Sequence, residues 1–119
     1  MEICFEGIGQ VVATFATKDA LTPGMAVTVT GSGEVGLSKT EGGGPLCGVT
    51  VGAERGGAAA VQIGGVVKVG CSGEDDLDVG WRELACDGKG GVTTAGGSDG
   101  VKCLVLAVDK GEKSVVVRL

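Results

Sequence analysis

Residues 46–69 read LCGVTVGAERGGAAAVQIGGVVKV, two apolar runs separated by the charged, glycine-containing segment AERGG at 53–57. Their β-branched residues stand largely at two-residue spacing: Val49, Val51, Val61, Ile63, Val67 and Val69. Alternation of this kind indicates strands, and the glycines can adopt the positive φ that a tight turn requires. The stretch is therefore predicted to form a β-hairpin, and it carries no residues typical of catalysis.

Length and composition exclude several classes of protein. A chain of 119 residues is expected to form one domain that buries roughly two-thirds of its unfolded surface. The sequence has 25 glycines, two prolines and 43% hydrophobic residues, without a Gly-X-Y period, which argues against a disordered tail and against collagen. Its net charge of -5 argues against nucleic-acid binding, because that affinity comes from clusters of Lys and Arg.

The five cysteines also limit the function. They are Cys4, Cys47, Cys71, Cys86 and Cys103. Their number is odd, no Cys-x-x-Cys pair occurs and the chain has no histidine, so neither a zinc site nor a complete disulfide framework is expected. We expect reduced, buried thiols. No apolar run approaches the ~20 residues of a membrane helix, and the first residues lack the pattern of a secretion signal, so no membrane partner is expected.

The N-terminal segment 1–17 is predicted to be an extended arm or a first strand, preceding a single β domain at 18–119. Its apolar residues, interrupted by Gly7 and Gly9, are Ile3, Phe5, Ile8, Val11, Ala13 and Phe15. These side chains could pack on the chain's own core or on another protein. Both interpretations stay open at the level of sequence.

Further strands are predicted at 25–30, 35–37, 81–86, 92–94, 101–108 and 114–119, joined by short glycine-rich turns. The connections are too short for helices and favour antiparallel neighbours. The acidic segment 74–78 lacks the ligand spacing of a calcium loop and is expected to be a solvated turn.

The chain partly matches itself at an offset of about 56 residues. The matched pairs are Leu21 with Leu77, Gly24 with Gly80, Met25 with Trp81, Gly44 with Gly100, Cys47 with Cys103, Val49 with Val105 and Val61 with Val117. We predict an all-β fold, a small antiparallel β-barrel or sandwich built from two degenerate repeats at about 20–69 and 76–119. In this scheme Cys47 and Cys103 fill equivalent core positions, while Trp81 either packs a barrel end or anchors an interface.

Motifs of enzymatic chemistry are weak in this chain. The segment 31–36, GSGEVG, matches the dinucleotide pattern, but the residues that follow cannot build the helix whose N-terminus would meet a pyrophosphate. Without histidine or tyrosine, no local signature marks a nucleophile or a general base. We expect no catalysis, no cofactor, no bound metal and no small-molecule substrate.

Five segments carry a resemblance to a known family. They are LTPGMAV at 21–27, GPLCGV at 44–49, GAAAVQIGGVVKV at 57–69, LDVGW at 77–81 and SVVVRL at 114–119. In their order of glycine turns and short valine strands they resemble the capsid decoration, or cement, proteins of tailed bacteriophages.

The resemblance implies a structural protein without an active site. Such a protein would be made in the bacterial cytoplasm, form a homotrimer and bind the major capsid protein on the exterior of the virion. The expected capsid or protomer contacts are Ile3, Phe5, Ile8, Val11, Phe15 and Trp81. The alternative is a non-catalytic β-rich binding or adhesive module of a phage or surface assembly.

Overall fold

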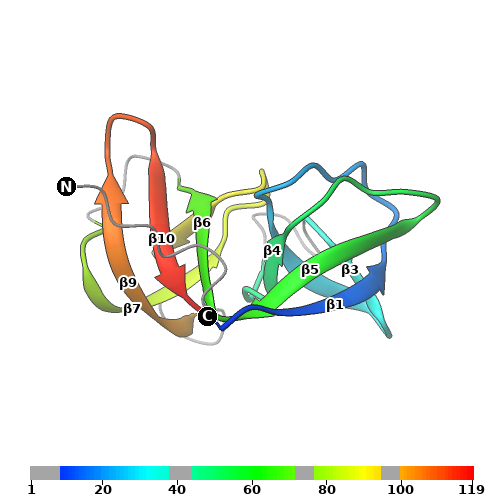
Figure 1. Ribbon diagram of the computed structural model, residues 1–119, viewed down its shortest axis with the longest axis horizontal. Helices are drawn as coiled ribbons and strands as arrows, with labels where there is room; N and C mark the ends of the chain where they lie inside the picture. Colours follow the sequence, from blue (N-terminus) through cyan, green and yellow to red (C-terminus); the bar gives the residue numbers. More distant parts are fainter. Residues whose placement is uncertain (1–8, 38–43, 72–76, 95–99) are drawn as a thin grey trace.

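A computed structural model describes residues 9–37, 44–71, 77–94 and 100–119. These residues form ten strands and no helix, which confirms the all-β prediction. The strands are β1 (Val11–Ala16), β2 (Ala26–Gly31), β3 (Glu34–Gly36), β4 (Gly48–Thr50), β5 (Ala58–Gly64), β6 (Val66–Gly70), β7 (Gly80–Cys86), β8 (Val92–Thr94), β9 (Val101–Asp109) and β10 (Ser114–Arg118). They make two five-stranded sheets that lie side by side along the longest dimension of the molecule (Figure 1).

The first sheet is a closed barrel in the order β1-β3-β2-β4-β5. Strand β1 closes it by pairing antiparallel with β5 and parallel with β3. The barrel interior is filled by Leu21, Val27, Val35, Ala59 and Val61, all buried. These small and branched side chains fit a narrow barrel, which accounts for the scarcity of aromatic residues.

The second sheet has the order β6-β10-β9-β7-β8. When β6 to β10 are matched to β1 to β5 in chain order, every pair of neighbouring strands in the second sheet matches a pair of neighbouring strands in the barrel. Even the parallel closure of the barrel has a counterpart, an isolated parallel bridge between Cys71, just after β6, and Val92 of β8. The two halves of the chain therefore have matching topology.

The pairing registers correct the predicted offset between the halves. In the barrel Ala26 pairs with Val49, and in the second sheet Trp81 pairs with Leu104. These registers agree with an offset of 55 in both pairs of strands, since 81 − 26 = 104 − 49 = 55, and not with 56 in both. The offset becomes 56 in the next strands. Thr50 pairs with Val61 and Val105 pairs with Val117, so matching Thr50 to Val105 matches Val61 to Val117.

This one-residue difference decides which side chains correspond. The predicted pairs Met25 with Trp81 and Val49 with Val105 do not hold together, because Ala26 would then match Arg82, whose partner is Cys103 and not Val105. Cys47, just before β4, is partly buried against the barrel core, whereas Cys103 is buried in the cluster of the second sheet.

The stretch 46–69 contains a hairpin, but it does more than predicted. Strands β4 and β5 pair antiparallel, while β6 leaves the barrel and pairs with β10 in the second sheet. The crossover lies at Gly65, whose φ is +88°. The buried amide of Gln62 donates from Nε2 to the carbonyl oxygens of Gly64 (2.9 Å) and Val66 (3.1 Å) on either side of it. The segment thus joins the two sheets instead of supporting one of them.

The barrel and the second sheet share a buried contact. Ala26 and Val49 of the barrel belong to the same hydrophobic cluster as the inner face of the second sheet. Two backbone hydrogen bonds cross the boundary, from Ala26 N to Gly90 O (2.8 Å) and from Cys86 N to Gly44 O (2.9 Å). The second sheet is therefore seated against the outside of the barrel, at β2 and β4.

Candidate contact surfaces

The predicted contact residues of the N-terminal segment differ in how exposed they are. Ile3, Phe5 and Ile8 lie outside the described residues. Val11 is the first residue of β1 and is 53% exposed. Phe15, on the same strand, is half-buried and packs against the barrel interior, so this ring contributes to the chain's own core.

Three apolar residues are exposed on β1 and its neighbour β5: Val11, Val12 and Ile63. Val12 pairs with Gln62, so Ile63 lies on the other face of β5 from Val12. The pairing register shifts between Val11 and Val12, which locally disturbs the alternation of faces.

Trp81 lies on the other sheet, in β7, with 52% of its surface exposed. The structure therefore does not bring it together with the predicted contacts of β1. Trp81 pairs with Leu104 of β9, which in turn pairs with Arg118 of β10. We call these three residues the Trp81 row.

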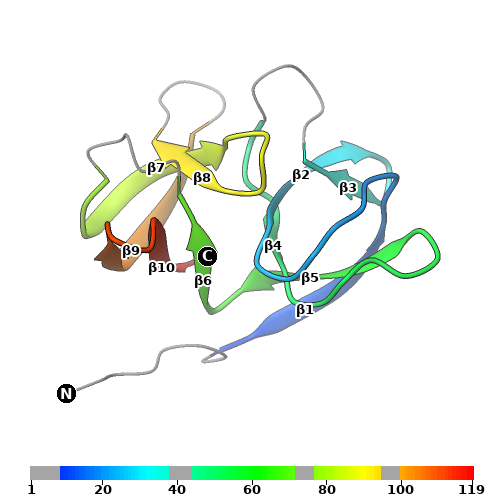
Figure 2. The same cartoon turned by 90° about the horizontal axis from the view of Figure 1, so that it is seen from above.

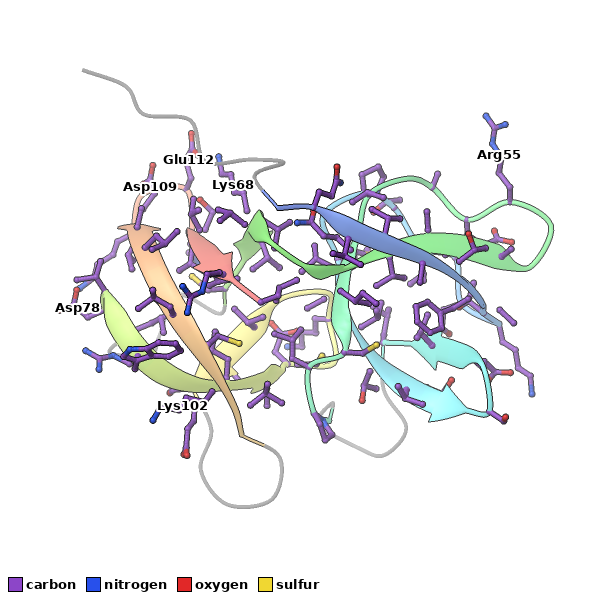
Figure 3. The ribbon with its side chains drawn as sticks, turned by 60° about the horizontal axis from the view of Figure 1, so that its bottom comes forward. Arg55, Lys68, Asp78, Lys102, Asp109 and Glu112 are labelled. Atoms are coloured by element: carbon purple, nitrogen blue, oxygen red, sulfur yellow. The ribbon has the colours of Figure 1, made fainter. Side chains whose placement is uncertain are left out.

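Two cations approach the indole of Trp81. Lys102 Nζ is 5.8 Å from the ring centroid and Arg118 Cζ is 5.3 Å from it. At exposed sites such cation–π contacts are worth about 0.5–1 kcal/mol each, so they hold the ring in place without burying it. Lys102 lies at the opposite end of the molecule from Arg55, which is in the turn between β4 and β5 (Figure 3).

Lys102 and Arg118 did not stand out in the sequence. The available signal was their place in the strands: Lys102 and Leu104 share one face of β9, and Arg118 ends β10 after a run of three valines. Only the cross-strand registers show that both cations reach the same indole ring.

Another exposed apolar residue of the barrel, Val29, lies near the end of β2. Val29 is 49% exposed and pairs with the buried Val35 of β3, so its side chain is on the opposite face of β2 from Thr30. Thr30 donates its hydroxyl to Glu34 Oε1 (3.0 Å), and Asp19 Oδ2 accepts the backbone N–H of Leu37 (2.9 Å). We call this group of residues, 29–34 with Asp19, the Val29 end.

The cysteines of the described part of the chain are free thiols. Burial raises the pKa of Cys47 and of Cys103. Burial, helped by the charge of the adjacent Asp87 and by Cys47, raises the pKa of Cys86 to about 12. These three thiols are protonated at neutral pH and are poor nucleophiles.

Other kinds of site find no support in the described ranges. Within them no group of three or more Cys, Asp or Glu side chains is placed to hold a metal ion. Most of the acidic segment 74–78 lies outside these ranges; its described Asp78 accepts the backbone N–H of Val79 (2.8 Å). None of the described segments is a helix long and apolar enough to cross a membrane. Comparison with protein-family models and with curated proteins finds no match.

Proposed function

We propose that this chain is a structural protein that binds the outside of a tailed-phage head and stabilises the capsid. The observation that carries the proposal is the order of glycine turns and short valine strands that the two halves of the chain share. The matching topology of the two sheets supports the further proposal that the halves are degenerate copies of one β unit.

The surface properties fit this role. A net charge of -5 keeps many copies soluble before assembly. Val11 and Val12, exposed at the start of β1, offer apolar side chains for a contact, and the resemblance implies further capsid contacts at Ile3, Phe5 and Ile8. We propose that three copies act together on the exterior of the virion, with the major capsid protein as partner.

Co-sedimentation with purified heads tests the proposal. The chain is mixed with expanded heads and with unexpanded precursor heads from a panel of tailed phages. Saturable binding to expanded heads of at least one phage is expected, and absence of binding to every head would refute the proposal. Replacement of Ile3, Phe5 and Ile8 by Ser should weaken binding, whereas the matched exposed change Val79→Ser should not.

The alternative, an adhesive or glycan-binding module, is favoured by one observation, the exposed indole of Trp81. Exposed tryptophans can stack on sugars, but Lys102 and Arg118 already stand over this ring. Reproducible hits on a glycan array, lost in Trp81→Ala, would replace the capsid proposal by this one.

A further inference from the structure

The outer face of the second sheet is apolar along the Trp81 row. The row crosses β7, β9 and β10 and continues on β6, where Val66 pairs with Arg118. Leu104 is half-buried on this face and Trp81 is 52% exposed. Val116, two residues before Arg118 on β10, lies on the same face. A sheet face that meets only water normally carries polar side chains, so this face has the composition of a covered surface.

Charge alone does not identify what covers this face. Lys102 stands beside Glu83, its partner across β7 and β9. Lys68 Nζ lies 3.2 Å from Glu112 Oε2. Because carboxylates stand close to these two cations, we expect the occupant to be recognised by its apolar side chains and by its position in the molecule.

The described chain begins at one end of the Trp81 row. Gly9 lies against Gly65, because a Cβ on Gly9 would be 3.7 Å from the Cα of Gly65. Gly65 immediately precedes Val66, and its carbonyl oxygen accepts the backbone N–H of Leu119 (2.9 Å), which follows Arg118. The segment 1–8 is therefore joined to the molecule next to β6 and β10, where the row ends.

Strand β1 also begins on the side of the sheet to which the row points. Figure 2 shows the start of β1 on the side of the molecule where β9 and β10 lie, away from β8. Val115 of β10 and Val92 of β8 are buried in one cluster, so the inner face of β10 is turned toward β8. The outer face of β9 and β10 is therefore on the side from which β1 starts.

The length of the segment 1–8 fits the row. Neighbouring strands are about 4.8 Å apart, so the path from Val66 on β6 across β10 and β9 to Trp81 on β7 covers about 14 Å. An extended chain advances about 3.3 Å per residue, so Phe5, four residues before Gly9, can reach about 13 Å from it. Phe5 can therefore contact the far part of the row.

The sequence of this segment suits an apolar face. Residues 1–6 read MEICFE. Alternate side chains of an extended chain fall on opposite sides. One side then carries Met1, Ile3 and Phe5, and the other carries Cys4 between two glutamates. Such a segment can place three apolar side chains on the sheet while its carboxylates stay in water.

We infer that residues 1–8 bind the outer face of the second sheet of their own molecule, with Phe5 against Leu104 and the indole of Trp81. The inference concerns the free protein and does not rest on the proposed function. It is tested without heads, so it can fail while head binding succeeds, and head binding can fail while it succeeds.

Quenching of Trp81 by a nitroxide label on Cys4 tests the inference. Trp81 is the only tryptophan, and a nitroxide quenches an indole only at short range. The labelled Cys4→Ser chain is the matched control, because it keeps any label on the half-buried Cys47 and Cys71. If more than about half of the molecules hold the segment on the sheet, the label on Cys4 should lower the emission about twofold or more. Emission equal to that of the control would overturn the inference.

Substitution of the apolar side chains tests how the segment is held. Replacing Ile3 and Phe5 together by Ser in the labelled chain should restore the emission to the level of the control. Val29→Ser, which removes an exposed apolar side chain at the Val29 end of the barrel, should leave the quenching unchanged. Circular dichroism checks that each variant is folded. Quenching that survives the loss of both apolar side chains would contradict the inference.

Mixing distinguishes the molecule's own segment from that of a second copy. A labelled Trp81→Phe chain carries the nitroxide on Cys4 but no indole, and it is mixed with the unlabelled natural chain. At about 1 μM, below the range of weak protein contacts, the mixture should show no quenching. Quenching in this mixture as strong as in the labelled natural chain would mean that the segment binds a second copy, and it would overturn the inference.

Discussion

Replacing Gly48 by alanine should destabilise the barrel strongly. Gly48 is buried in β4, where that strand runs closely against β5. A Cβ at this position would overlap the backbone oxygen of Gln62 and lie 2.7 Å from Cγ1 of Val61. The oxygen belongs to the backbone of a paired strand and cannot rotate away, so β4 and β5 must separate to admit one methyl group.

The expected loss is about 3 kcal/mol of unfolding free energy, at the upper end of the cost of adding a methyl group to a packed core. A chain of this size has about 6–15 kcal/mol in total, so the Gly48→Ala variant still folds. Its melting temperature should fall by about 10–15 °C. Urea unfolding followed by circular dichroism measures the free energy, and a thermal scan measures the midpoint.

Gly52→Ala is the matched control, because a Cβ on Gly52 meets no atom within 4 Å and no positive φ is required there. This control should stay within about 0.5 kcal/mol of the natural chain. A loss for Gly48→Ala of less than about 1 kcal/mol relative to Gly52→Ala would refute the reasoning. It would mean that the two strands are not as close as the structure has them.

Two other changes test the crossover and the thiols. Gln62→Leu should cost about 1–3 kcal/mol in urea unfolding, because the carbonyls of Gly64 and Val66 lose their buried donor. Thr14→Val, at an exposed position of β1, should cost far less, and equal losses would contradict this role. For Cys86, whose pKa rises from 9.0 to about 12 on folding, ionisation favours the unfolded chain. The stability that it contributes is complete below about pH 9 and is lost as the pH rises toward 12. The urea midpoint should therefore fall between pH 8.5 and 10.5, less steeply in Cys86→Ala, and identical slopes would refute the assignment.

Much of the fold was readable from local patterns. Alternating β-branched residues and glycine turns place strands close to their observed bounds, and the segment 92–94 agrees with β8 to the residue. The matching halves were also visible as an offset in the sequence. These features are local, since two-residue alternation and turn chemistry act within a few neighbouring residues.

The candidate site was less predictable. Trp81 could be singled out because it is the only tryptophan, but sequence left open whether it is buried or exposed. Phe15 was a contact candidate, yet its ring packs into the barrel. Burial of this kind depends on which strands become neighbours, and nothing local to β1 specifies its pairing with both β3 and β5.

The sequence by itself determined that this protein is all-β and roughly where its strands and turns lie. Only the tertiary structure decided that β6 pairs with β10 in the second sheet and that half of the Trp81 surface stays exposed. The physical reason is the two-residue period of a strand: a register shift of one residue reverses a face, and register is set by partners far away in the chain.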